Sequence, residues 1–168
     1  IRAPAGSLAG VSAFQIHFSS KDIHTPGDSP DVLVAMNPAA LKVHQKEIVP
    51  GGTIILNTDA FTKKNLNFAG YESSPVEDGT LDDYFTLIPI EMNKLVTAAC
   101  EGLEISRKFV GRTKNFFALG VLYYMYDRPL DATEKWLEKK FKGKDIIIEA
   151  NKRAMNAGYN YADTTELF

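Results

Sequence analysis

Residues 2–37 read RAPAGSLAGVSAFQIHFSSKDIHTPGDSPDVLVAMN, and this stretch decides the fold. A loop rich in Gly and Ala (residues 3–10) leads into residues 12–18, where apolar and polar side chains alternate. A period of two predicts a β-strand. A turn-rich segment follows, and then a short apolar run (residues 32–35) that ends at Met36-Asn37-Pro38. A loop that feeds a strand, and a second strand that ends in polar residues, predict the ligand-binding edge of an open α/β sheet.

The remaining sequence predicts a mostly parallel sheet flanked by helices. The run at 32–35 lacks alternation, which predicts a central strand buried on both faces. Further strands are predicted at residues 53–57 and 85–90, and Pro89 favours an edge position for the latter. Asn37 is predicted to cap a helix that has Pro38 in its first turn. The predicted helices cover residues 39–46, 63–69, 91–101, 106–126, 131–142 and 145–157.

The C-terminal half is expected to be helical, with residues 106–126 as its longest helix. Gly111 and Gly120 would each cost this helix about 1 kcal/mol relative to Ala, unless close packing needs them. The cluster Tyr123-Tyr124-Met125-Tyr126 is interpreted as packing surface, with a cofactor platform or a partner interface as the alternatives. Residues 159–168 are expected to form an extended tail or linker that leaves a domain spanning residues 1–158.

Composition excludes several classes of function. A net charge of -2 gives no electrostatic reason to expect nucleic acid as a partner, and no apolar run reaches the ~18–20 residues of a membrane span. The single cysteine, Cys100, fits a reducing compartment and hence the cytoplasm, and its apolar neighbours predict a buried thiol. Metal-ligand clusters and the common catalytic motifs are missing, so we expect neither a metal site nor a catalytic residue in this chain.

The loop before the first predicted strand is the candidate binding site. Its backbone amides and the hydroxyl of Ser7 could hold a phosphate, and Arg2 could supply the positive charge. Asn37 ends the run at 32–35, and Asn57 ends the strand at 53–57, so we expect both polar tips on one edge of the sheet. A glycine-bearing loop is weak support by itself, and a loop without a ligand stays the alternative.

Four blocks of sequence in a fixed order resemble one known family. They are IRAPAGSLAGVSAFQIHF, HTPGDSPDVLVAMNPAAL, PGGTIILNTDAFTKKNL and RTKNFFALGVLYYMYDRP. These blocks resemble the γ-type domain of 2-oxoacid:ferredoxin oxidoreductases, and most of all the domain that opens the α subunit of the 2-oxoglutarate type. The resemblance implies a three-layer Rossmann-like open sheet. In this family a strand and a G-x-G-G-x-G turn precede the matched segment, so the first βα unit is expected to lie outside this chain.

The resemblance also implies a function. Such enzymes oxidatively decarboxylate a 2-oxoacid on thiamine diphosphate with Mg²⁺, pass electrons through a [4Fe-4S] cluster to ferredoxin, and transfer the acyl group to coenzyme A. The γ-type domain is associated with holding coenzyme A, which makes its predicted contacts Arg2, Gly6, Ser7, Gly10, Ser12 and Asn37. The implied partners are the thiamine-binding α and β parts of the enzyme, and the isolated chain is expected to be inactive. The alternative is a structural domain of the same complex that binds no ligand.

Overall fold

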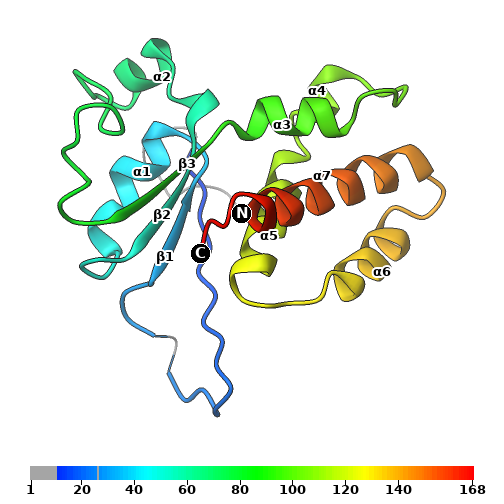
Figure 1. Cartoon of the computed structure of the whole chain (residues 1–168), viewed down its shortest axis with the longest axis horizontal. Coiled ribbons are helices and arrows are strands. Elements are labelled where there is room, and N and C mark those ends of the chain that lie inside the picture. The colour runs from blue at the N-terminus through cyan, green and yellow to red at the C-terminus, as the bar shows by residue number, and fades with distance from the viewer. Residues whose placement is uncertain (1–10, 26) are drawn as a thin grey trace. The chain divides into compact units, whose positions relative to one another are not determined.

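The computed structural model describes residues 11–25 and 27–168, and the chain divides into two compact units, Ile1–Ile90 and Glu91–Phe168 (Figure 1). The first unit contains the sheet, and the regular secondary structure of the second unit consists of helices. Within the part of the chain described, no helix has both the length and the apolar character needed to cross a membrane.

Three parallel strands form an open sheet in the order β1 (Val32–Ala35), β2 (Thr53–Asn57) and β3 (Thr86–Ile90). The predicted α/β class and parallel sheet are confirmed. β2 is the central strand, so the prediction of a central strand at residues 32–35 is wrong. Because β2 pairs on both sides, four of its residues are fully buried, whereas most of β1 is only half-buried. β3 lies at an edge, as Pro89 predicts.

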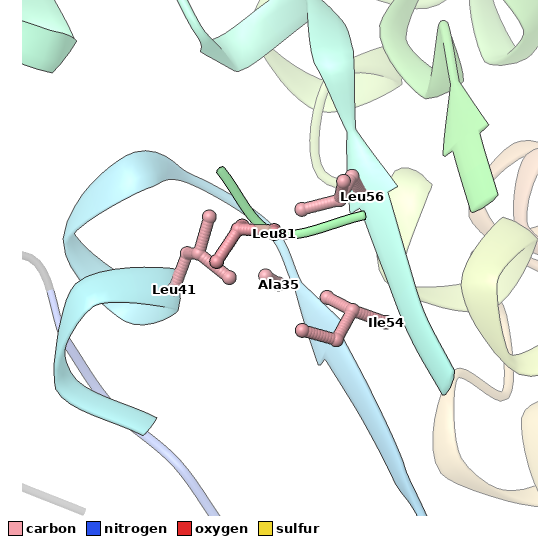
Figure 2. Close-up of a cluster of buried hydrophobic side chains, with 5 residues drawn as sticks. All are labelled: Ala35, Leu41, Ile54, Leu56 and Leu81. Carbon is pink, nitrogen blue, oxygen red and sulfur yellow. The ribbon is translucent and has the colours of Figure 1, made fainter. Parts of the chain in front are cut away.

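Short helices follow the strands of this unit. α1 (Pro38–His44) and the 3₁₀ turn η1 (Gln45–Glu47) follow β1, while η2 (Thr58–Ala60) and α2 (Lys63–Phe68) follow β2. Leu41 of α1 points at the side chains of one sheet face, where it meets Ala35, Ile54 and Leu56 (Figure 2). Leu81, from the segment between α2 and β3, completes this cluster. Ile54 and Leu56 are two residues apart on one strand, so they share this face.

The second unit contains five helices among its described residues: α3 (Met92–Ala99), α4 (Arg107–Val110), α5 (Lys114–Met125), α6 (Asp131–Lys140) and α7 (Asp145–Thr164). The prediction of one long helix at 106–126 is wrong, because a turn at residues 111–113 separates α4 from α5. In that turn the buried hydroxyl of Thr113 donates to the carbonyl oxygen of Val110 at 2.7 Å, which holds the chain in the turn. The longest helix is α7.

α5 and α7 touch backbone to backbone at two glycines. A Cβ added at Gly120 would overlap the carbonyl oxygen of Met155, and one added at Gly158 would overlap that of Phe117. Both glycines are buried in helix interiors. The helix cost of Gly120 is therefore offset by close packing, as the sequence analysis allowed.

The prediction of an extended tail from residue 159 is wrong, because α7 continues to Thr164. The ring of Tyr159 stands edge-on to that of Tyr124, with 5.4 Å between centroids, and the ring of Tyr161 lies 6.0 Å from that of Phe117. These two contacts hold the C-terminal turns of α7 against α5. The Tyr124 contact also supports the interpretation of residues 123–126 as packing surface.

Residues 12–18 do not form a strand in the described chain, which contradicts the prediction from their alternation. Their apolar side chains are exposed instead, with Phe14 at 80% and Ile16 at 67% of full exposure. A strand needs a neighbouring strand to bond with, and the sheet of the described residues consists of β1, β2 and β3 without this segment. Its pattern is that of a strand, but the partner that would make it one is absent from the described residues.

Candidate functional site

The carboxyl ends of β1 and β2 meet at one edge of the sheet. β2 ends at Asn57, whose side chain is fully buried. Its amide nitrogen Nδ2 donates to the carbonyl oxygen of Met36, just after β1, at 3.4 Å. The prediction that both strand ends share an edge is therefore confirmed, and this is the edge at which open α/β sheets bind ligands.

Asn37 lies at this edge as the N-cap of α1. Its side-chain oxygen Oδ1 accepts a hydrogen bond from the backbone N–H of Ala40 at 2.8 Å. The backbone of Asn37 is extended, with φ at -163°, and Pro38 occupies the first helical position. This confirms the predicted cap. It also means that the carboxamide oxygen of Asn37 satisfies the helix backbone, which is a structural role.

The other predicted binding residues lie at the start of the chain. Arg2, Gly6, Ser7 and Gly10 fall outside the described residues. Ser12 is exposed in the segment that lacks helix and strand. Their assignment as cofactor contacts therefore stays a prediction.

A small apolar cluster, which no sequence pattern indicated, contains Val11, the first described residue. Val11, the residue after Gly10, forms one buried cluster with Ala39 of α1 and with Ala69, and Tyr71 packs against this cluster. Ala39 is two residues after Asn37, so the cluster that contains Val11 includes the first turn of α1. Small apolar residues scattered over 60 positions carry no periodic signal, and for that reason the sequence did not indicate this cluster.

Polar contacts reinforce this corner of the first unit. The ammonium group of Lys42 lies 4.8 Å from the centre of the Tyr71 ring and also donates to the carbonyl oxygen of Gly70. Burial, and secondarily the negative charge of Asp78, raise the pKa of Tyr71 to about 12. The Tyr71 hydroxyl therefore stays protonated through the physiological range, and the ring serves as a neutral platform for Lys42.

The described residues hold no group of three or more His, Cys, Asp or Glu side chains that could bind a metal ion. His24, the histidine in the loop after residue 18, is exposed. Cys100 is buried, as predicted, and burial raises the pKa of its thiol, which disfavours the reactive thiolate. A [4Fe-4S] cluster takes four Cys thiolates, and one cysteine in the whole chain does not supply them.

These features define an α/β fold with an open parallel sheet, in which the first two strands end in polar residues at one edge. A family model described as Pyruvate ferredoxin/flavodoxin oxidoreductase matches residues 4–161, and the chain belongs to this family. The resemblance seen in the sequence is thus confirmed.

Two known relatives are similar to this chain along most or all of its length. The chain is 50% identical, over all 168 residues, to 2-oxoglutarate oxidoreductase subunit KorA of Mycobacterium tuberculosis, and covers 26% of that protein. It is 26% identical over 160 residues to ketoisovalerate oxidoreductase subunit VorA of Methanothermobacter marburgensis, covering 91% of this chain and 27% of that one. The chain thus spans about a quarter of the length of these relatives. Both are oxidoreductase subunits.

A solved structure shares the fold. It is a 2-oxoglutarate:ferredoxin oxidoreductase from Magnetococcus marinus, solved with 2-oxoglutarate, coenzyme A and succinyl-CoA bound. The match has a TM-score of 0.61 at 23% identity and covers 87% of this chain and 22% of that one. At this identity the likeness establishes the fold.

Proposed function

We propose that this chain is the γ-type domain of a thiamine-diphosphate-dependent 2-oxoacid:ferredoxin oxidoreductase, and that its 2-oxoacid is 2-oxoglutarate. The observation that carries this proposal is the 50% identity to KorA, a 2-oxoglutarate oxidoreductase subunit, over every residue of the chain. The family match over residues 4–161 supports the same class of enzyme. In the cell we place the enzyme in the cytoplasm, where a lone buried thiol such as Cys100 stays reduced.

In this proposal the domain does not carry out the chemical step. Thiamine diphosphate with Mg²⁺ supplies the electron sink for decarboxylation when it is bound, so this domain need not supply an acid–base pair. The [4Fe-4S] cluster needs cysteines that this chain lacks. Thiamine, Mg²⁺ and the cluster therefore belong to the other α and β parts of the enzyme, and ferredoxin is its electron acceptor.

The contribution proposed for this chain is to hold coenzyme A and to assemble with the other subunits. Coenzyme A presents phosphates, which a guanidinium and backbone amides bind well. Arg2, with Gly6, Ser7, Gly10 and Ser12, would provide these groups, and Asn37 would border them. The support from the structure is that Val11, the residue after Gly10, belongs to the same buried cluster as Ala39, which lies in the first turn of α1 after Asn37.

The test is the Michaelis constant for coenzyme A, measured in the assembled enzyme. Arg2→Ala is expected to raise it about tenfold, as the loss of one charge-assisted contact of about 1.4 kcal/mol would. Lys21→Ala is the matched control, since it also removes a cation from residues 2–37 and Lys21 is exposed. Ser7→Ala is compared with Ser20→Ala in the same way. An unchanged constant for coenzyme A in both Arg2→Ala and Ser7→Ala would refute the binding role.

A structural domain that binds no ligand is the second candidate. The observation in its favour is that the side-chain oxygen of Asn37 is engaged by the backbone of α1. This alternative predicts that Arg2→Ala and Ser7→Ala leave every Michaelis constant unchanged. It also predicts that deleting the domain prevents assembly of the complex, which size-exclusion chromatography would detect.

A further inference from the structure

The outer side of α6 and the turn that follows it carry a dense positive charge. Residues 135–144 contain five lysines and one glutamate, a net charge of +4, although the whole chain has a net charge of -2. The lysines are all exposed, and a half-exposed tryptophan lies among them. We call this surface the basic face of α6; it consists of Lys135, Trp136, Lys139, Lys140, Lys142 and Lys144.

Helical spacing gathers this charge on one side. Lys135, Trp136, Lys139 and Lys140 are spaced by one, three, four or five positions, which puts them on the same half of a helix. Leu137 lies on the opposite side and is fully buried. α6 therefore presents its lysines outward because its apolar residue is directed inward.

Two of the three acidic residues of α6 face a lysine of α7 rather than these lysines. Glu138 accepts a hydrogen bond from the ammonium group of Lys152 in α7 at 2.6 Å, and Glu134 lies 3.8 Å from the same group. Among the ion pairs of the described residues, none includes a lysine of the basic face. The positive charge of this face is thus uncompensated by the described part of its own chain.

Trp136 adds an apolar anchor to the basic face. Its ring is 50% exposed and stands edge-on to the ring of Phe141, with 6.4 Å between centroids and an angle of 87°. This contact holds the indole while leaving half of it open to solvent. A held, exposed tryptophan is the kind of side chain that dominates the energy of protein interfaces, and surrounding charges steer the partner to it.

The composition of the basic face selects its partner. A nucleic-acid partner normally goes with a strongly basic domain, whereas the isoelectric point of this chain is about 5.9. A permanent subunit contact is usually large and apolar, whereas this face consists of five lysines around one tryptophan, and such charged surfaces steer transient encounters. We propose that the basic face of α6 docks the acidic surface of the ferredoxin that accepts the electrons of the enzyme, a proposal that rests on the function proposed above.

The experiment measures electron transfer from the assembled enzyme to two acceptors, with 2-oxoglutarate and coenzyme A as substrates. One acceptor is an acidic ferredoxin, and the other is methyl viologen, a small dication that needs no docking surface. The test variant is Lys135→Glu/Lys139→Glu/Lys140→Glu. The matched control, Lys46→Glu/Lys63→Glu/Lys64→Glu, reverses three exposed charges in the first unit.

The test variant is expected to raise the Michaelis constant for ferredoxin about tenfold at low ionic strength. The difference should disappear at about 0.5 M salt, where charges a few ångströms apart are screened. The control variant should change this constant less than twofold, and viologen reduction should be the same in all three proteins. Trp136→Ala, which keeps every charge, should raise the constant for ferredoxin without the dependence on salt.

Three results would overturn the proposal. An unchanged constant for ferredoxin in the test variant would show that docking occurs elsewhere. A failure of both the test variant and the milder Lys139→Glu to assemble would show that the basic face is a contact between subunits. A wild-type enzyme that does not reduce viologen with 2-oxoglutarate and coenzyme A would refute the proposed function itself, and the viologen reaction separates that outcome from the other two.

Discussion

Replacing Gly158 by Ala should destabilise the second unit, because α5 and α7 cross with their backbones in contact at this residue. The new Cβ would lie 2.8 Å from the carbonyl carbon of Phe117 and closer still to its oxygen. Ordinary contacts of a Cβ begin at about 3.4 Å, and both atoms belong to a helix backbone that cannot rotate aside. The two helices must therefore move apart along the crossing, which would also loosen the neighbouring contact at Gly120.

The size of the effect follows from two opposing terms. Overpacking of a tight core costs about 1–3 kcal/mol or somewhat more, and Ala gains about 1 kcal/mol over Gly in a helix interior. A severe overlap with backbone puts the first term at its upper end, so we expect a net loss of about 2 kcal/mol in the free energy of unfolding. For a chain of this size that corresponds to a fall of about 4–8 °C in Tm.

The assay is thermal and urea unfolding followed by circular dichroism at 222 nm, since the second unit is mostly helical. Gly111→Ala is the matched control, because a Cβ there would lie 3.6 Å from its nearest neighbour, the carbonyl oxygen of Arg107. The backbone of Gly111 is right-handed helical, with φ at -59°, so Ala fits without strain. If Gly158→Ala were as stable as Gly111→Ala, the backbone contact between α5 and α7 would be refuted.

Three further predictions concern single side chains. Asn37→Ala should lower the free energy of unfolding by about 1 kcal/mol through loss of the α1 cap, whereas Asn37→Ser should retain most of it; equal urea midpoints for the two variants would contradict the cap. The hydroxyl of Tyr71 should titrate with a pKa of about 12, measured by absorbance at 295 nm. Because this hydroxyl loses its proton near pH 10 in the unfolded chain but not in the folded chain, the free energy of unfolding should fall between about pH 10 and 12. A Tyr71→Phe variant should lose that part of the fall. Cys100 should resist a thiol reagent at pH 8 in the native protein and react at once in 6 M guanidinium, so rapid native labelling would show that its burial is not maintained.

The sequence predicted those elements whose signals are local. The apolar runs of β1 and β2, the cap of α1 at Asn37 and the edge position of Pro89 depend on a few neighbouring residues. The order of the strands in the sheet was not predicted correctly. The sequences of β1 and β2 are both apolar, and only the pairing shows that β2 lies between β1 and β3. The helical periodicity of the apolar residues also predicted that residues 111–113 are helical. In the structure they form a turn, in which the hydroxyl of Thr113 donates a hydrogen bond to the carbonyl oxygen of Val110.

Helix ends and glycines were predicted least well. The last helix predicted from the sequence ends at residue 157, which puts Gly158 directly after it, in the place where a C-terminal glycine is common. It is instead a contact point within α7, where the absence of a side chain lets Phe117 approach. The same residue type serves both purposes, and only the packing of a helix distant in sequence distinguishes them. For this reason Tyr159 and Tyr161 were placed in a tail rather than in a helix.

The sequence predicted where the candidate site lies in the fold better than it predicted what each of its side chains does. The meeting of two strand ends at one edge follows from parallel pairing, and the bond from Asn57 to Met36 confirms it. What the side chains do there depends on contacts that spacing does not reveal. Asn37 was predicted to be both a cap and a ligand contact, and the structure shows the first of these roles. No pattern indicated Val11, although it forms one buried cluster with Ala39 of α1.

The alternating apolar side chains of residues 12–18 are exposed, and this affects the solubility of the chain at high concentration. Six or seven residues with β-forming side chains, little charge and no proline are the composition from which cross-β aggregates grow. Phe14 and Ile16 are open to solvent here, and the segment containing them has no charged side chain to deter stacking of identical copies. At high concentration, the 168 residues alone should therefore deposit thioflavin-positive fibrils through this segment. A Phe14→Lys variant should stay in solution under the same conditions.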